Sequence, residues 1–149
     1  MIVEMKLHHA LTVAFSMTAR ARYEVLGVRA DDDVEKWAIE RYATPGISYA
    51  LVEDGKTLAV MGVVASGPPH VGTVWLVAAE GWQKHVKQCV KLWKLILKSA
   101  GYRRLEALVY SDNKCALRMA EWAGLKFECE RPAYTKRGET VAQFGMVLT

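Results

Sequence analysis

The chain has no uninterrupted apolar stretch near the roughly 20 residues that a membrane-spanning helix needs. Its start, MIVEMKLHHALTVAF, carries charged residues and two histidines where an export signal would be basic and then apolar. Cysteine is scarce: Cys89, Cys115 and Cys129 are odd in number, widely spaced and set within apolar patterns. That arrangement argues against a disulfide framework and predicts reduced thiols in the core. We therefore expect a soluble, cytoplasmic protein that is not exported.

Metal-binding spacings are missing as well. The sequence contains no CxxC or HExxH pattern. His8 and His9 are adjacent, and adjacent side chains on a helix point about 100° apart, so these two histidines would not converge on one ion. We therefore expect no metal site.

The chain does have enough apolar material for a core. With 149 residues, of which 52% are hydrophobic, it has the size of one compact domain that buries most of the surface its unfolded form exposes. Its formal net charge of +4 permits anionic partners, yet an excess of this size is also ordinary for a soluble domain. No internal repeat or linker divides the chain, so we expect a single domain spanning residues 1–149.

Helical periodicity marks the first part of the chain. Apolar residues from Leu7 to Phe15 recur at helical spacing and predict a first helix that runs toward Arg20. The acidic run 31–33 can cap a second helix, which the proline and glycine of 44–46 end. The predicted buried stripe of that second helix is Val34, Trp37, Ala38 and Tyr42.

Strands are expected next. Ser48–Glu53 and Thr57–Val64 are rich in β-forming residues and flank Asp54–Gly55, the strongest hairpin signal in the chain. The two runs should pair antiparallel. A Gly-Pro-Pro break then precedes a buried strand over Val71–Val77.

A long amphipathic helix is predicted from Trp82 to Ala100, with apolar residues on one side and five lysines on the other, and Gly101 is placed to end it. Leu105–Tyr110 should be a strand parallel to the strand before the helix, because strand–helix–strand units cross over in that way. We expect Ser111 or Asp112 to cap a further helix.

That last helix has a core face of Ala116, Met119, Ala120 and Ala123, and Gly124 ends it. Phe127–Glu130 and Thr140–Leu148 then read as a closing antiparallel pair of strands.

The order of these elements, with Asn113, Ala116 and Gly124 in the last helix, resembles the GNAT N-acetyltransferase family over nearly the whole chain. The resemblance implies an α/β (α+β) fold: a central mixed, mostly antiparallel sheet flanked by about four helices. It also implies acetyl-CoA as cofactor, with the pantetheine arm beside the strand before the long helix and the pyrophosphate at the helix start. The implied cofactor residues are Trp75, Leu76, Val77, Gln83, Lys84, Lys87, Asn113 and Ala116.

The phosphate motif departs from the family pattern. A phosphate site of this kind uses converging backbone N–H groups, with glycines where side chains would block close approach. Read from Gln83, the family's QxxGxG pattern has Val86 and Gln88 at the glycine positions, and only Gly81 lies nearby. Lysines at the helix start could supply charge in place of that geometry.

The second motif departs as well. Ala120 stands where the family commonly has a tyrosine that protonates the departing thiolate, and Leu125 stands where it has phenylalanine. Tyr110 or Tyr134 could replace that general acid if the fold brings either into reach. Glu80, between strand and helix, is our candidate base for an incoming ammonium, although an exposed loop acid is the simpler reading.

The leading hypothesis is therefore an acyltransferase that moves an acetyl group from acetyl-CoA to a primary amine of a small molecule or protein, with the oxyanion held by a strand amide near Val77. The missing glycines and tyrosine keep a second hypothesis open. The same features are similar to small GNAT-like proteins of tailed phages, including internal virion proteins, which implies a non-catalytic protein that binds a host or phage protein.

Binding to nucleic acid is the weakest hypothesis. Lysines at regular spacing opposite an apolar helix face are more often a solvated surface, and no exposed aromatic residues are interleaved with them. The sequence leaves the acyl acceptor and the oligomeric state open. Asn113 is likewise read in two ways, as a contact to the cofactor's amide arm or as a simple helix cap.

Overall fold

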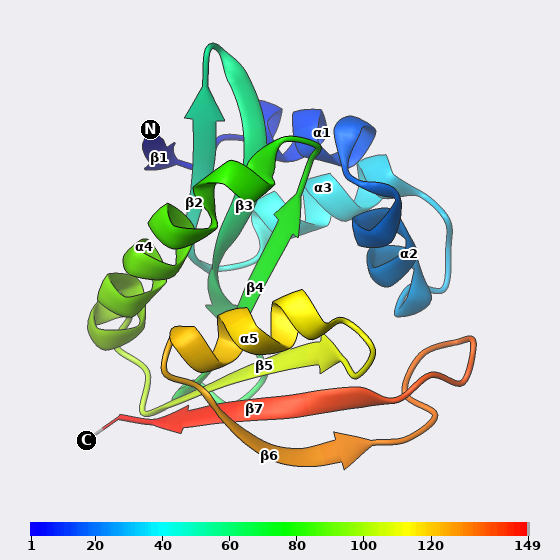
Figure 1. Ribbon diagram of the computed structural model, residues 1–149, viewed down its shortest axis with the longest axis vertical. Helices are drawn as coiled ribbons and strands as arrows, with labels where there is room; N and C mark the ends of the chain where they lie inside the picture. The colour runs from blue at the N-terminus through cyan, green and yellow to red at the C-terminus, as the bar shows by residue number, and fades with distance from the viewer. Residues whose placement is uncertain (149) are drawn as a thin grey trace.

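Seven strands form one mixed sheet in the computed structural model, which describes residues 1–148 (Figure 1). The strand order is β1-β2-β3-β4-β5-β7-β6, and every neighbouring pair is antiparallel except β4 and β5. This confirms the predicted mixed, mostly antiparallel α/β fold. The strands are β1 (Ile2–Glu4), β2 (Gly46–Glu53), β3 (Lys56–Ala65), β4 (Val71–Ala78), β5 (Arg104–Tyr110), β6 (Lys126–Arg131) and β7 (Val141–Val147).

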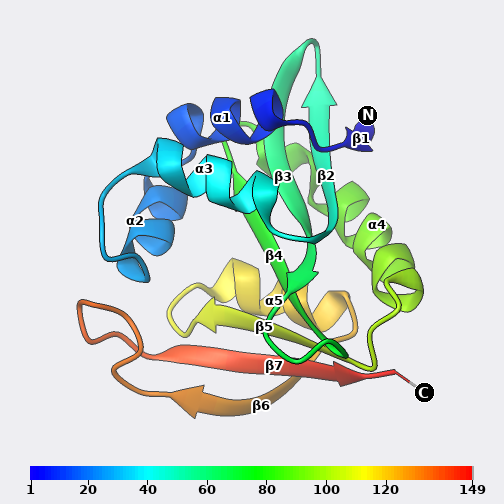
Figure 2. The same ribbon diagram turned by 180° about the vertical axis from the view of Figure 1, so that it is seen from behind.

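Five α-helices and one 3-10 turn flank the sheet within the described residues, one helix more than expected. They are α1 (Leu7–Ser16), α2 (Ala19–Gly27), α3 (Val34–Ala43), η1 (Trp82–His85), α4 (Val86–Ser99) and α5 (Lys114–Trp122). Helices α4 and α5 lie on one face of the sheet, and α1 and α3 lie on the other (Figures 1 and 2). Across residues 1–148, no helix has the length and apolar character to cross a membrane.

The additional helix corrects the expectation that the first helix runs on toward Arg20. Helix α1 ends at Ser16, and Met17 takes an extended conformation that forms a β-bridge with Ala79. Thr18 then starts α2, because its side-chain hydroxyl accepts a hydrogen bond from the amide of Ala21 at 3.0 Å. One continuous periodic stretch is thereby divided into two helices.

The hairpin signal is confirmed. Asp54 and Gly55 both have positive φ, 50° and 75°, as the two-residue turn between β2 and β3 requires. The start of α3 is also as expected, because the Asp33 carboxylate accepts a hydrogen bond from the amide of Lys36 at 2.9 Å. Tyr42 does not lie in the predicted buried stripe: it is exposed, because the side of α3 that faces the sheet continues from Trp37 and Ala38 to Arg41, which lies over the Trp75 ring.

Each face of the sheet has its own hydrophobic cluster. Leu97 and Phe144 lie in the cluster covered by α4 and α5, and Val13 and Trp37 lie in the cluster covered by α1 and α3. Burial of many such side chains is the main stabilising term for a domain of this size. The long helix is shorter than predicted, because the first turn of the expected range is the 3-10 turn η1.

The expectation of core thiols is confirmed for one cysteine and wrong for the other two. Cys89 is fully buried in α4, and burial raises the pKa of its thiol to about 11. Cys115 and Cys129 are exposed. Cys115 lies in the first turn of α5, and Cys129 lies in β6, the last strand of the sheet, which no further strand covers.

Candidate functional site

The sheet splits between β4 and β5. The parallel pairing predicted from the sequence is present, but it comprises three residue pairs: Val71 with Arg104, Gly72 with Leu105, and Thr73 with Glu106. Beyond these pairs the two strands diverge, as Figure 1 shows. The last five residues of β4 and the last four of β5, 74–78 and 107–110, therefore have no partner across the split.

The main chain of Leu76 faces this split. Ala79 donates its amide to the carbonyl of Leu58 at the β3 side, at 2.8 Å, whereas the carbonyl of Ala78 accepts from the amide of Thr18 on the other side, at 3.0 Å. Because backbone groups alternate along a strand, odd-numbered residues of β4 point to β3 and even-numbered residues point away from it. The N–H and C=O of Leu76 thus face the gap, and the amide of Val77 faces β3.

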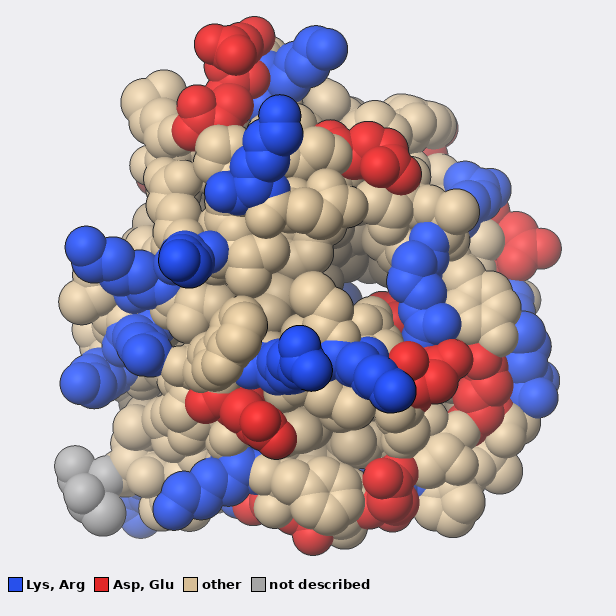
Figure 3. Space-filling view, viewed as in Figure 1, with Lys and Arg blue, Asp and Glu red and all other residues tan. Residues whose placement is uncertain are grey.

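A cavity of about 840 Å³ fills the split. In the space-filling view, the surface is hollowed above α5, between α4 and α2 (Figure 3). Side chains from α2, α3, β4, β5 and α5 line it, together with the segment between β4 and α4. The cavity therefore meets both faces of the sheet, which a cleft between two paired strands could not do.

Most of the predicted site residues line this cavity. They are Trp75, Leu76, Val77, Glu80, Gln83, Tyr110, Asn113, Ala116 and Tyr134. Lys84 and Lys87 do not line it; they are exposed on η1 and at the start of α4. The residues predicted from β4 and from α5 therefore line one cavity, whereas the two predicted lysines lie outside its wall.

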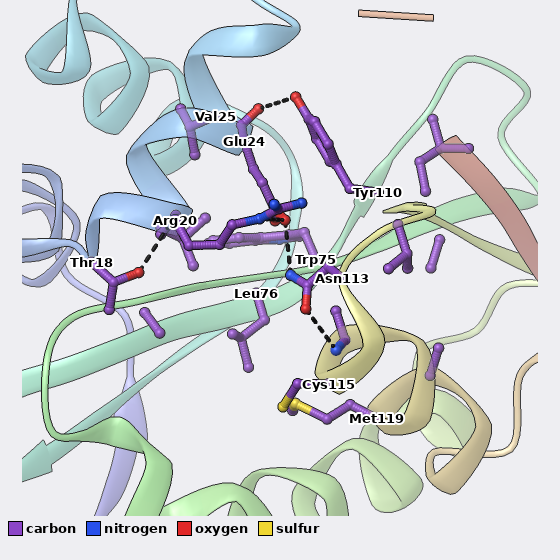
Figure 4. A pocket seen from close by; sticks show the side chains of 18 of the residues that line it. Thr18, Arg20, Glu24, Val25, Trp75, Leu76, Tyr110, Asn113, Cys115 and Met119 are labelled. Carbon is purple, nitrogen blue, oxygen red and sulfur yellow. Dashed lines mark hydrogen bonds and ion pairs between the residues drawn. The ribbon is translucent and has the colours of Figure 1, made fainter. Parts of the chain in front are cut away.

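Asn113, and neither Ser111 nor Asp112, caps α5. Its side-chain Oδ1 accepts a hydrogen bond from the amide of Ala116 at 3.1 Å, and its Nδ2 donates to the Glu24 carboxylate at 2.8 Å. Asn113 is the residue directly before the first helical residue, so its side chain has the shortest reach to the free amides. Both hydrogen-bonding ends of the amide are therefore engaged (Figure 4).

Helix α2 closes the cavity on one side, and the sequence analysis missed it. Arg20 forms ion pairs with Glu24 and with Asp112 in the β5–α5 loop, each at 2.6 Å. The hydrogen bonds to these carboxylates raise the pKa of Arg20 and lower that of Asp112. Together with the Asn113–Glu24 hydrogen bond, these contacts tie α2 to the start of α5 across the split. Thr18 was the one sequence signal that could have revealed α2.

Tyr110 lies at the α2 side of the cavity (Figure 4). Its hydroxyl donates to the main-chain carbonyl of Glu24 at 2.9 Å, and burial raises the pKa of the phenol to about 12. The close approach requires Gly27, because a Cβ atom there would lie 2.1 Å from the Tyr110 hydroxyl. Tyr134 also lines the cavity but is exposed, with the Arg131 guanidinium over its ring.

Three arginines reach the α2–α3 side of the cavity, and two of them are paired. Arg29 binds Asp31 and Glu40 at 2.9 and 2.8 Å, and Arg20 is paired as described. Arg41 lies over the ring of Trp75, with 4.7 Å between the guanidinium carbon and the ring centroid. No residue from 1 to 148 forms a hydrogen bond or ion pair with the Arg41 side chain.

The outer end of the cavity leads to η1. Gly81 precedes η1 with φ 92°, and no side chain caps the first amides of this turn. Lys84 and Lys87 project from the same region, while Val86 and Gln88 occupy the helix where the phosphate motif has glycine. The fit to a pyrophosphate therefore depends on charge more than on a glycine loop. No cluster of three potential metal ligands occurs among the described residues.

No protein-family model matches the chain, and no curated protein matches its sequence. Its fold is nevertheless found in solved acetyltransferase structures. An N-acetyltransferase from Staphylococcus aureus Mu50 superposes with a TM-score of 0.82 at 13% identity, covering 100% of this chain and 98% of that chain. A GNAT-family acetyltransferase from Streptococcus pneumoniae has a TM-score of 0.71 and 18% identity, covering 100% and 99%.

A third structure carries the cofactor. A putative acetyltransferase, yncA, from Salmonella typhimurium with its cofactor acetyl-CoA has a TM-score of 0.75 at 13% identity, covering 100% of this chain and 94% of that chain. At such low identities the likeness shows a shared fold. That fold is the GNAT fold that the order of elements in the sequence indicated.

Proposed function

We propose that this chain is a cytoplasmic, acetyl-CoA-dependent N-acetyltransferase that acts on a primary amine. The observation that carries the proposal is the split between β4 and β5, which leaves the main chain of Leu76 facing a cavity open to both faces of the sheet. An extended chain with amide groups can pair with such an unpaired strand segment. The pantetheine arm of an acyl carrier is a chain of that kind.

The residues around the split fit such an arm. On the α4–α5 side the cavity is walled by apolar side chains, including Leu76, Trp93 and Met119, which suit its alkyl groups. Gln83 lies where the cavity opens toward η1. Lys84 and Lys87, exposed just beyond it, would bind the phosphates as point charges.

The chain's own groups can assist acyl transfer. A bound thioester supplies an already activated acetyl group, so the protein has to align the amine, accept its proton and hold the developing negative charge. The Leu76 amide is the donor for that oxyanion, since it is the free amide next to Val77 that faces the cavity. Glu80 accepts the proton of the ammonium, and Tyr134 returns a proton to the thiolate, since the Tyr110 hydroxyl already donates to the carbonyl of Glu24.

Calorimetry with acetyl-CoA tests the proposal directly. We expect micromolar binding by the wild type and a loss of at least about tenfold in Lys84→Ala/Lys87→Ala, because two phosphate contacts are removed. Lys94→Ala/Lys98→Ala is the matched control: it removes the same charge from the same helix face, but far from η1. An equal loss in both variants would indicate a general effect of charge.

No binding at millimolar acetyl-CoA would contradict the proposal. In that case the alternative from the sequence analysis, a protein-binding role in a phage virion or against a host enzyme, would be pursued by affinity capture at several salt concentrations.

A further inference from the structure

Arg41 is the one cavity-lining arginine without a partner among residues 1–148. Its Nε atom is fully buried and forms no hydrogen bond, and neither Nη atom forms one. Burying the Nε–H group without an acceptor is costly, because this donor loses water and gains no hydrogen bond in return. Burial, followed by the nearby positive charge of Arg29, lowers the pKa of Arg41, which shows that its surroundings disfavour the charge. Arginine nevertheless stays charged at neutral pH.

No neighbouring acid forms an ion pair with Arg41, although the charge of Glu40 favours its charged form. Glu40 precedes Arg41 in the chain, but its carboxylate pairs with Arg29 on the other side. Glu24 is held by Arg20 and Asn113. The carboxylates around this part of the cavity are therefore bound to other side chains, and none of them pairs with Arg41.

The Arg41 guanidinium is also fixed in place. It lies over the face of Trp75, and the edge of Trp37 packs against Trp75 at a centroid distance of 6.5 Å and an angle of 83°. A guanidinium placed over an aromatic ring can still donate its N–H groups to an anion.

We propose that the acceptor is a small amine that also bears a carboxylate, as a free amino acid does, and that Arg41 binds the carboxylate. This inference rests on the proposed acetyl transfer, since it names the acceptor of that reaction. Two parallel N–H···O bonds from the two Nη atoms of Arg41, which are not among the buried unpaired atoms, match the geometry of a carboxylate. Trp37, Val25 and Val28 line the same side of the cavity and offer an apolar wall for the acceptor's side chain.

Matched pairs of compounds test this assignment by calorimetry. Each pair consists of a free amino acid and the amine left after removal of its carboxylate: alanine and ethylamine, phenylalanine and phenethylamine, tryptophan and tryptamine. We expect at least one amino acid to bind the wild type about ten- to a hundredfold more tightly than its amine, the range for hydrogen bonds to a charged group. O-phosphoethanolamine is the comparison for a phosphate-bearing amine.

Arg41→Met should abolish the preference within each pair. Methionine keeps an unbranched chain against the Trp75 ring, so folding should be preserved, and circular dichroism checks this. Arg22→Met is the matched control, because Arg22 is exposed on α2 and does not line the cavity. It should retain the wild-type preference.

Three results would overturn the inference: equal binding within every pair, a preference that survives in Arg41→Met, or tighter binding of O-phosphoethanolamine than of any amino acid. Failure of every compound to bind at millimolar concentration would overturn it too. The proposed function is judged separately by acetyl-CoA binding. If the protein binds acetyl-CoA and acetylates the amines as readily as the matching amino acids, the proposed acetyltransferase function stands and the proposed carboxylate-bearing acceptor is wrong.

Discussion

The two sides of the cavity differ in kind. On the α4–α5 side, the wall is apolar and its hydrogen-bonding groups come from the main chain of β4. On the α2–α3 side, the wall carries charged side chains held in ion pairs, with Arg20, Glu24 and Arg29 among them. Both sides border one split in one sheet. The difference suggests a division of tasks: one side takes a long, flexible carrier by shape, and the other selects an acceptor by charge.

Leu76→Pro has the largest expected effect. It removes the main-chain N–H of residue 76, which faces the cavity on its apolar side. Beyond the split, β4 is locally an edge strand, where a proline is tolerated if its missing N–H faces away from the neighbouring strand. We expect the variant to fold and its kcat to fall by about 10²–10³-fold, the loss typical of one oxyanion donor. A thiol-release assay with acetyl-CoA measures kcat.

Two controls bracket this result. Leu76→Ala shortens the side chain but keeps the amide, so it should retain most of the activity. Val77→Pro removes an amide that faces β3 and should destabilise the fold. A folded Leu76→Pro protein with the kcat of Leu76→Ala would show that this amide takes no part in the reaction.

Glu80→Gln has the second-largest expected effect. It tests whether Glu80, which lines the cavity between β4 and η1, is the general base. If Glu80 accepts the ammonium proton, kcat should fall by about 10²-fold while the Kd for acetyl-CoA stays the same. Glu24→Gln is the matched comparison, because Glu24 is the other carboxylate in the cavity wall. Its oxygens are occupied by Arg20 and Asn113, so we expect a smaller loss of kcat. A larger loss of kcat in Glu24→Gln than in Glu80→Gln would identify Glu24 as the base.

Substitutions of Asn113 test the link between the two sides. Asn113→Ala removes both the cap of α5 and the hydrogen bond to Glu24, and the free energy of unfolding should fall by about 1–2 kcal/mol. Asn113→Asp keeps an oxygen that can cap but places a second carboxylate against Glu24. Thermal melts should show that Asn113→Asp is more stable at pH 4 than at pH 7, relative to wild type. An equal difference in melting temperature between Asn113→Asp and wild type at both pH values would show that the Glu24 contact contributes nothing.

The smallest expected effect concerns Glu128, which does not line the cavity. It serves as a reference for the stability measurements. Arg104 and Gln143 donate to the Glu128 carboxylate and lower its pKa from 4.5 to about 2. Because the folded state favours the charged form, this contribution is complete above the unfolded pKa and is lost as the pH falls toward 2. Glu128→Gln should therefore narrow the stability difference between pH 6 and pH 2. The change should stay below about 1 kcal/mol, since the pair is partly exposed.

The apolar side was predictable from the sequence because its signals are local. Leu76 and Asn113 are separated by one strand–helix–strand unit. Its helix is marked by the 3.6-residue period of 82–100 and by the turn at Gly101, and its two strands are expected to be parallel. The charged side was not predictable. Residues 19–27 mix charged and apolar positions without a clear stripe, and the Asn113–Glu24 hydrogen bond joins residues 89 positions apart.

Arg41 shows the same limit for a single residue. Helical spacing puts it on the same side of α3 as Trp37 and Ala38, but an arginine there is normally expected in solvent, and the predicted buried stripe was assigned to Tyr42 instead. Its position over Trp75 follows from packing between α3 and β4, which a one-dimensional pattern does not contain.

The split also changes how the sheet meets solvent over time. In most sheets, the amides of the middle strands exchange with deuterium last, because both neighbours hold them. Here Leu76 and Leu108 lie in the middle of a seven-stranded sheet, yet their N–H groups face a cavity that has no strand in it. Deuterium should therefore enter the centre of this sheet before it reaches the amides that join β5 to β7, and a ligand seated in the split should slow the exchange of these two amides first.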